Sequence, residues 1–160
     1  MKKMKHSFKS GLGFGLTSGV ITTLGLMVGL FSGTNSKLAV IGGILTIAIS
    51  DSMSDALGIH VSQESQNKNS VRAIWEATLA TFLSKLILTL SFIIPVLTLE
   101  LFQAIIVSVI WGLSILSFFS FIVAKQQQED PWKAVAEHLT IASVVVLVTY
   151  FVGNWISLTF

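Results

Sequence analysis

Cysteine is absent from the 160 residues, and only 11% of them carry a formal charge at neutral pH. The absence of cysteine excludes disulfides, thiolate metal sites and cysteine nucleophiles, and it leaves the redox compartment undetermined. A soluble domain of this length carries roughly 25% charged residues. The shortage of charge therefore argues against a soluble protein.

Hydrophobic residues, in contrast, make up 52% of the chain, and the mean hydropathy is +0.80. They gather in five apolar runs separated by short polar breaks, and a bilayer core requires roughly 20 apolar residues in each crossing. We expect an all-α integral membrane protein, with residues 1–160 forming a single transmembrane domain. The expected spans are 11–32, 38–61, 71–97, 99–124 and 134–160.

The first ten residues, MKKMKHSFKS, resemble the basic start of a secretory signal peptide. The apolar run at 12–31 is longer than a signal-peptide core, and four more apolar runs come after it. We therefore expect the run to remain as the first span.

The basic residues are unevenly distributed between the two expected faces of the membrane. Eight of the ten fall in the N-terminal segment and in the second and fourth connections, which alternating spans place on one face: Lys2, Lys3, Lys5, Lys9, Lys68, Arg72, Lys125 and Lys133. Basic residues near span ends stay cytoplasmic, so we expect the N-terminus inside and the C-terminus outside. The net charge of +2 is too small to indicate nucleic-acid binding. We expect the protein to lie in the plasma membrane of a prokaryote.

Two glycine runs with a spacing of four occur in the first span. They are Gly11, Gly15 and Gly19, followed by Gly25, Gly29 and Gly33. Small residues at this spacing clear one face of a helix and let a neighbouring helix approach closely. Two interpretations remain open, generic helix packing and a surface along which helices slide during transport.

The segment AISDSMSDALGIH, residues 48–60, places two aspartates inside the second span. Ser50, Asp51, Ser54, Asp55 and Gly58 have the spacing of one helical stripe. A carboxylate near mid-bilayer costs about 2.5 to 3.5 kcal/mol, so the pair requires a cavity, a counter-charge, a proton or a metal. We expect Asp51, Asp55, Ser50 and Ser54 to bind a divalent cation, because hard and borderline ions prefer oxygen ligands. Asp55 is expected about six residues from the cytoplasmic end of its span, within reach of water.

Lys85 is the only basic residue that we expect to be buried in a span, and an ion pair with one aspartate is the alternative to a metal site. One lysine cannot neutralise two carboxylates, so both interpretations hold together if Lys85 occupies the site when the cation is absent. His60 and Glu64 at the cytoplasmic end, and Glu100 at the opposite end, are candidate vestibule or coupling residues. The alternative is that these three residues are ordinary solvated residues at helix ends.

Enzyme motifs are missing from the sequence. It contains no GxSxG, no phosphate-binding glycine loop before a lysine and no HExxH. We therefore expect neither catalysis nor a resident cofactor, and transport is the default role for intramembrane carboxylates.

Two segments carry a resemblance to a known family. GLGFGLTSGVITTLGLMVGL, residues 11–30, is similar to the first-helix pattern G-x-x-D-G-L followed by G-L-x-x-G-L. AISDSMSDALGIHVSQES, residues 48–65, is similar to the second-helix pattern A-I-S-M-G-x-G-E-Y ending in S-Q. Over these first 65 residues the chain resembles the vacuolar iron transporter family. The resemblance implies a dimer of five-helix subunits that exports Fe²⁺ or Mn²⁺ from the cytosol, with proton exchange.

The chain departs from the family pattern at several positions. Asp55 stands where the family has a second-helix Glu, Asp51 where it has a Met, and Phe14 where its first helix has an Asp ligand. The connection at 61–70 is too short for the cytosolic metal-binding insert, so the chain looks like a divergent short member. An all-oxygen site would suit Mn²⁺ or Mg²⁺ at least as well as Fe²⁺.

Together these features predict an exporter of a divalent cation, iron or manganese by resemblance, that acts as a C2 homodimer. Symmetry would bring together two copies of Asp51 and Asp55, and with two Lys85 the net charge would be −2, which matches one divalent ion. The alternative is a non-transporting assembly or scaffold protein, in which the aspartates and Lys85 close a polar network.

Overall fold

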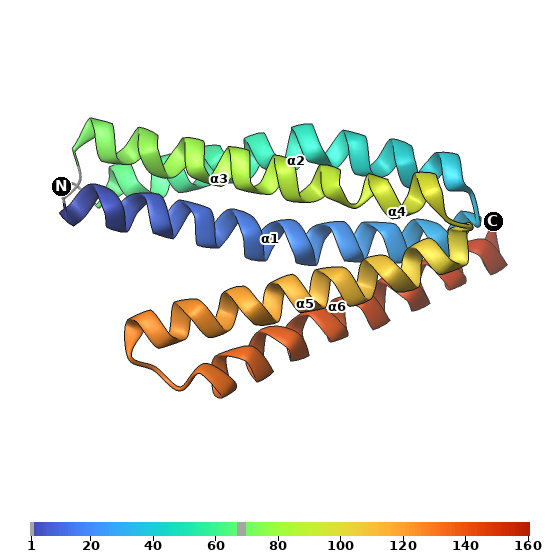
Figure 1. The fold of residues 1–160 in the computed structure, drawn as a ribbon. Coiled ribbons are helices and arrows are strands. Elements are labelled where there is room, and N and C mark those ends of the chain that lie inside the picture. Colours follow the sequence, from blue (N-terminus) through green and yellow to red (C-terminus); the bar gives the residue numbers. More distant parts are fainter. Residues whose placement is uncertain (1, 67–69) are drawn as a thin grey trace.

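The computed structural model describes residues 2–66 and 70–160; Lys68 and the side chains of Lys2, Lys3 and Lys5 lie outside this description. The helices are α1 (Lys2–Thr34), α2 (Lys37–Ser65), α3 (Val71–Ser91), α4 (Ile93–Thr98), α5 (Leu101–Gln127) and α6 (Pro131–Thr159) (Figure 1). Five stretches are long and apolar enough to cross a membrane, with α3 and α4 together forming the third. The expectation of an all-helical chain with five such helices is confirmed.

Short polar connections define the starts of three long helices. Ser36 caps α2, Ser70 caps α3 and Asp130 caps α6, each side chain accepting a hydrogen bond from a backbone N–H in the first turn. Such caps satisfy donors that have no partner inside the helix. Asn35 and Gln128 have positive φ angles of 45° and 61°, which let the chain turn sharply after α1 and α5.

The third span is broken, although the sequence predicted one continuous helix over 71–97. The chain leaves the regular helix at Phe92, where the backbone N–H donates to Thr89 O at 3.2 Å, and α4 begins at Ile93. Pro95 lies in the first turn of α4 and explains the break. Proline has no N–H to donate and its ring clashes with the carbonyl four residues earlier, here that of Ser91.

The second span is longer than expected, and this changes the depth of its aspartates. α2 has 29 residues and ends at Ser65 rather than near residue 61, so Asp51 is its fifteenth residue and Asp55 lies ten residues before its end. At 1.5 Å per residue, Asp51 is about 21 Å from either end of the helix. Asp55 therefore lies ten residues, rather than about six, before the end of its helix.

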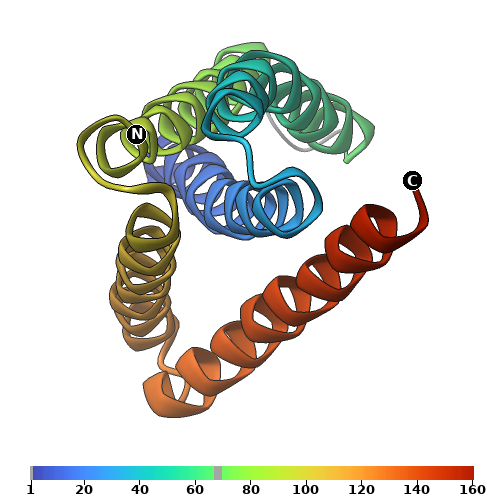
Figure 2. The ribbon, with the colours of Figure 1, turned by 90° about the vertical axis from the view of Figure 1, so that its right-hand side faces the viewer.

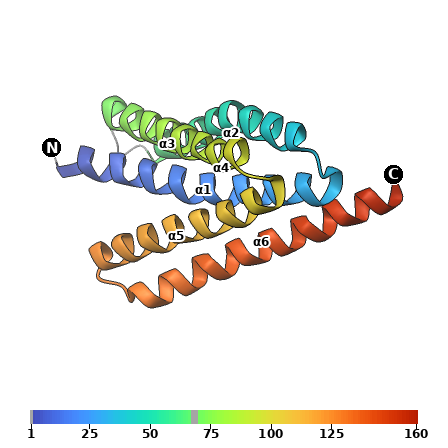
Figure 3. The same cartoon turned by 45° about the vertical axis from the view of Figure 1, so that its right-hand side comes forward.

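α1 lies at the centre of the bundle, between the α2–α3 pair and the α5–α6 pair (Figure 2). The start of α1 lies at the same end as the end of α2, the start of α3 and the α5–α6 connection, and the C-terminus lies at the other end (Figures 1 and 3). The segments that carry most of the basic residues therefore lie at one end of the molecule, as the alternation of spans predicted.

The two glycine runs of α1 lie on two faces of the helix, so the expectation that they clear one face is wrong. Gly11, Gly15 and Gly19 lie against α3, whereas Gly25, Gly29 and Gly33 lie against α6. The six residues between Gly19 and Gly25 explain the difference. At about 100° per residue they turn the helix by about 600°, which puts the second run some 240° around from the first.

Apolar packing fills the half of the bundle away from the N-terminus. The core there includes Leu24, Met27, Ile44, Phe92 and Leu116, all less than 2% exposed. Polar side chains gather next to this core, nearer the middle of the spans, and they form the candidate site.

Candidate functional site

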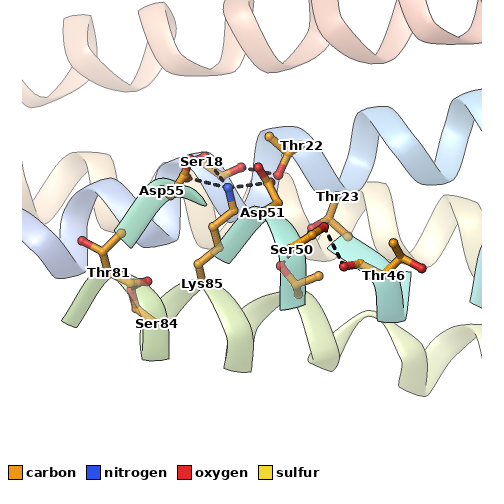
Figure 4. A network of polar contacts seen from close by, with 11 residues as sticks. Ser18, Thr22, Thr23, Thr46, Ser50, Asp51, Asp55, Thr81, Ser84 and Lys85 are labelled. Carbon is orange, nitrogen blue, oxygen red and sulfur yellow. Dashed lines mark hydrogen bonds and ion pairs between the residues drawn. The ribbon is translucent and has the colours of Figure 1, made fainter. Parts of the chain in front are cut away.

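Four polar side chains from three helices meet at the middle of the bundle (Figure 4). Lys85 of α3 places its Nζ atom 2.5 Å from Oδ2 of Asp51 and 2.5 Å from Oδ2 of Asp55, both on α2. The same ammonium donates a hydrogen bond to Oγ of Ser18 on α1, at 2.9 Å. We call these four residues the Lys85 cluster.

The Lys85 cluster lies near the middle of two helical stretches that are long and apolar enough to cross a membrane. Lys85 is the fifteenth residue of the 28-residue stretch Val71–Thr98, and Asp51 is the middle residue of α2. Charged groups at this depth are costly and need protein partners. The depth makes the balance of charge inside the cluster important.

That balance is incomplete, because two carboxylates face one ammonium and leave one negative charge in excess. The Lys85 side chain is 1% exposed, whereas those of Asp51 and Asp55 are 29% and 19% exposed at the surface of the single chain. The ammonium is thus enclosed, while parts of the two aspartate side chains remain accessible at the surface of the single chain. An ion that reaches them meets two carboxylates that share one ammonium.

Asp51 and Asp55 interact with Lys85 in different ways. Lys85 donates a hydrogen bond to Asp55 Oδ2. Asp51 Oδ2 is equally close but lies outside hydrogen-bond geometry, and it is a buried oxygen without a hydrogen-bond partner among the described residues. The ion pair with Lys85 offsets the burial of this oxygen, and the Asp51 side chain as a whole is the more exposed of the two, at 29% against 19% for Asp55.

A glycine of α1 leaves space for the Lys85 side chain where α1 packs closely on α3. A Cβ atom at Gly19 would lie 3.3 Å from Lys85 Cγ and 3.4 Å from a methyl of Leu88, so the glycine lets the lysine stem pass over α1. One turn before Lys85, Thr81 Oγ1 donates at 3.0 Å to the backbone carbonyl of Gly11, which lies two turns before Gly19. This first glycine run therefore positions the enclosed ammonium.

The stripe expected on α2 is divided between two faces. Asp51 and Asp55 turn toward α1 and α3, whereas Ser50, Ser54 and Gly58 are exposed on the outside of the chain. Ser50 Oγ donates to Thr46 O at 2.8 Å, one turn back in its own helix. Asp51 lies one residue, or about 100°, beyond Ser50, which explains how adjacent residues reach different faces.

The outer serines belong to a regular row of small residues along α2. We call this row the α2 outer stripe; it comprises Gly42, Thr46, Ser50, Ser54 and Gly58, each four residues after the last and all exposed. A Cβ atom added at Gly42 or Gly58 would have no neighbour within 4 Å. A row of this kind lets a second helix pack closely.

The other candidate residues lie away from the Lys85 cluster. His60 packs its ring edge-to-face on Trp75, with centroids 4.8 Å apart, and its Nδ1 lies 3.0 Å from Thr78 Oγ1. Glu64 is exposed near the end of α2. Glu100 is exposed at the opposite end and precedes α5 without a side-chain capping bond.

Ser18 is a member of the cluster that the sequence did not single out. Serine is common in membrane helices, so its presence in the first span did not indicate a site. Ser18 does lie one turn after Phe14, the position where the resemblance implied an acidic ligand. Phe14 itself is 44% exposed and lines a pocket between α1 and α5. It does not fill the space beside the aspartates.

Within residues 2–66 and 70–160 of a single chain, no three His, Cys, Asp or Glu side chains are grouped to hold a metal. The two aspartates of the Lys85 cluster could supply carboxylate oxygens, and a complete coordination sphere would need further oxygens from a second chain or from water. A scan against family models and a search of curated proteins give no match for this chain.

Proposed function

We propose that this protein transports a divalent metal cation across the membrane, with the Lys85 cluster as the central binding step. The observation that supports this proposal is the unequal charge at mid-span, where Asp51 and Asp55 share one ammonium. A purely structural ion pair needs only one carboxylate for each lysine. The second aspartate is costly in a membrane unless a cation or a proton uses it.

The working unit is a C2 dimer that packs through the α2 outer stripe. Exposed small residues at a spacing of four support this arrangement, and Asp51 and Asp55 each directly follow a serine of the stripe in the sequence. A twofold axis along the stripe would bring two Lys85 clusters close to each other. Four carboxylates and two ammonium groups then carry a net charge of −2, which one divalent cation neutralises.

Lys85 serves as a tethered counter-ion in this mechanism. When the metal ion is bound, the carboxylates share their oxygens between it and the ammonium; when the ion leaves, the ammonium limits repulsion between the two aspartates. Protons compete with metal for carboxylate oxygens, so an acidic compartment favours release. Proton exchange would in this way drive the ion outward.

The ligands favour ions that prefer oxygen. Carboxylate and hydroxyl oxygens suit Mg²⁺, Mn²⁺ and Fe²⁺, and the resemblance to the vacuolar iron transporter family in residues 11–30 and 48–65 favours Fe²⁺ or Mn²⁺. The excess of basic residues at the end that holds the N-terminus favours export from the cytoplasm, with that end inside.

Transport by reconstituted vesicles tests the proposal. Asp55→Asn keeps the size of the side chain but removes its charge, and we expect it to abolish uptake of Mn²⁺ into proteoliposomes while the purified protein stays folded. Glu64→Gln is the matched control, because Glu64 is an exposed acid on the same helix, and its uptake should equal that of the wild type. Uptake retained by folded Asp55→Asn would remove Asp55 from the pathway.

A scaffold role is the second candidate, and the position of Lys85 between both aspartates favours it. In that case the cluster only fixes the register of α1, α2 and α3. Lys85→Met separates the two functions. In a transporter the variant has more negative charge at the site, binds Mn²⁺ more tightly and regains stability when Mn²⁺ is added; in a scaffold Mn²⁺ has no effect on its stability.

A further inference from the structure

A pocket of about 480 Å³ lies at the end of the bundle that holds the N-terminus, between α1, α5 and α6. Figure 1 shows α5 and α6 diverging from α1 toward this end. Its volume falls in the range typical of small-ligand sites. None of the residues of the Lys85 cluster lines it, so it is a separate feature; we call it the end pocket.

The lining of the end pocket changes from polar to apolar with depth. The exposed rim consists of Lys9 and Ser10 on α1 and Gln126 and Gln127 on α5. The walls below are formed by Phe14, Phe119 and Val123. A phospholipid has the same order of groups, with a polar head at the membrane surface and hydrocarbon beneath.

The rim offers hydrogen-bond donors and positive charge. Lys9 Nζ donates to Gln126 Oε1 at 2.8 Å, which fixes the lysine beside α5 and leaves two of its three N–H groups for a ligand. With its oxygen occupied, the Gln126 amide presents its NH₂ group. No Asp or Glu is among the lining residues, so the pocket favours an anion over a cation.

Beside the apolar walls, at the depth of Phe119, the end pocket also has one polar contact. Ser120 is 2% exposed, and its Oγ donates to Leu116 O while lying 2.6 Å from His138 Nδ1. Both contacts are hydrogen bonds only if Nδ1 carries the proton and donates it to Ser120. Ser120 lies six residues, or about 9 Å, deeper than Gln126 along α5, so a ligand bound at the rim must extend below its headgroup to reach it.

We propose that the end pocket binds an anionic phospholipid, with the phosphate at Lys9 and Gln126 and the start of an acyl chain against Phe14 and Phe119. A free phosphate ion would satisfy the rim alone. The apolar walls favour the lipid, because they remain exposed when only a small hydrophilic anion is bound.

Ligand-dependent thermal stability of the full chain in a neutral detergent tests this site, since a ligand that binds only the folded state raises the unfolding temperature. Three probes are titrated separately: dioctanoyl phosphatidylglycerol, dioctanoyl phosphatidylcholine and inorganic phosphate. We expect phosphatidylglycerol to stabilise the protein in a saturable manner, with little effect from the other two.

Two variants and one control locate the effect. Lys9→Gln should weaken the apparent affinity for phosphatidylglycerol about tenfold, the usual effect of losing one charge-assisted hydrogen bond. Lys125→Gln is the control, because Lys125 is an exposed lysine at the same end of α5 but does not line the pocket. Gly13→Leu should abolish the response, since a Cβ at Gly13 already contacts the Phe119 ring at 3.4 Å and the rest of the side chain would fill the pocket.

Several results would overturn the proposal. Equal stabilisation by phosphatidylcholine would show that the pocket does not select charge, and equal stabilisation by inorganic phosphate would assign the rim to a free anion. Equal losses of affinity for phosphatidylglycerol in Lys9→Gln and Lys125→Gln would mean that the lipid responds to the general surface charge and not to this pocket. An unchanged response in a folded Gly13→Leu protein would place the lipid elsewhere.

Discussion

Two faces of α1 each use a run of three glycines to pack closely against another helix, but the contacts that result are different. Against α3, Gly11, Gly15 and Gly19 lie opposite Ala77, Thr81 and Lys85, a constant separation of 66 residues. Against α6, Gly25, Gly29 and Gly33 lie opposite Val145, Thr149 and Gly153, a constant separation of 120 residues. Constant separations mean that α1 runs parallel to both partners, with turns in register.

The chemistry at the two contacts differs. On the α3 face, Thr81 donates a hydrogen bond to a backbone carbonyl of α1, and the Thr23 and Thr89 hydroxyls form a hydrogen bond between the helices. The glycines on this face also leave room for the enclosed ammonium of Lys85. On the α6 face Thr149 bonds only to carbonyls of its own helix. Glycine spacing alone thus indicates where helices approach, and the partner helix decides whether the contact carries charge.

Of the substitutions at the two contacts of α1, Lys85→Met should have the largest effect on stability. Removing the ammonium leaves two carboxylates without a counter-charge, and loss of one partner of a buried ion pair costs roughly 3 to 5 kcal/mol. We expect this loss in the free energy of unfolding, measured in detergent without divalent cations. Lys37→Met is the control, since Lys37 is exposed and donates to the backbone oxygen of Leu99, and its effect should be below about 0.5 kcal/mol. Equal stability of the two variants would mean that the cluster does not stabilise the fold.

Alanine at one glycine of each run gives the next largest difference. At Gly15 a Cβ would lie 2.6 Å from the backbone oxygen of Thr81, so α3 must move, and we expect a loss of roughly 1 to 3 kcal/mol. At Gly29 the nearest atom would be Thr149 O at 3.5 Å, an ordinary contact, and alanine favours the helix. Gly29→Ala should therefore be neutral or slightly stabilising in chemical unfolding; a larger loss there than at Gly15 would contradict the packing described for the two faces.

Threonine-to-valine substitutions should give the smallest difference. Thr89→Val removes the interhelical hydrogen bond between the Thr23 and Thr89 hydroxyls, which is 3.2 Å long and fully buried. Interhelical bonds of this kind contribute roughly 0.6 kcal/mol in membranes. Thr149→Val loses only bonds within its own helix, and we expect a smaller change in the unfolding temperature than for Thr89→Val. The reverse order would show that the α3 face gains nothing from its polar contacts.

Much of this architecture could be predicted from the sequence, because long apolar runs and short breaks leave few other folds. The membrane-spanning length of the helices, the grouping of basic segments at one end and the pairing of Lys85 with aspartate all follow from hydropathy and charge. The break at Phe92 could have been predicted from Pro95, whose missing N–H interrupts a helix.

The finer geometry of the site could not be predicted in the same way. Ser50 and Asp51 are adjacent, and which of them faces α3 depends on how α2 is rotated, a result of packing rather than of local pattern. Engagement of both aspartates by one lysine, and the contribution of Ser18 from α1, depend on three helices meeting at one depth. The end pocket arises from the divergence of α5 and α6 from α1, which leaves no periodic signal in the sequence.

Metal-dependent thermal stabilisation of the purified protein tests most directly whether the excess carboxylate in the Lys85 cluster is a cation site. We expect Mn²⁺ or Fe²⁺ to raise the unfolding temperature of the wild type in a saturable manner, and a double variant, Asp51→Asn with Asp55→Asn, to lose that response while remaining folded. No stabilisation of the wild type by Mg²⁺, Mn²⁺, Fe²⁺, Co²⁺ or Zn²⁺, or the same stabilisation in the double variant, would contradict the assignment.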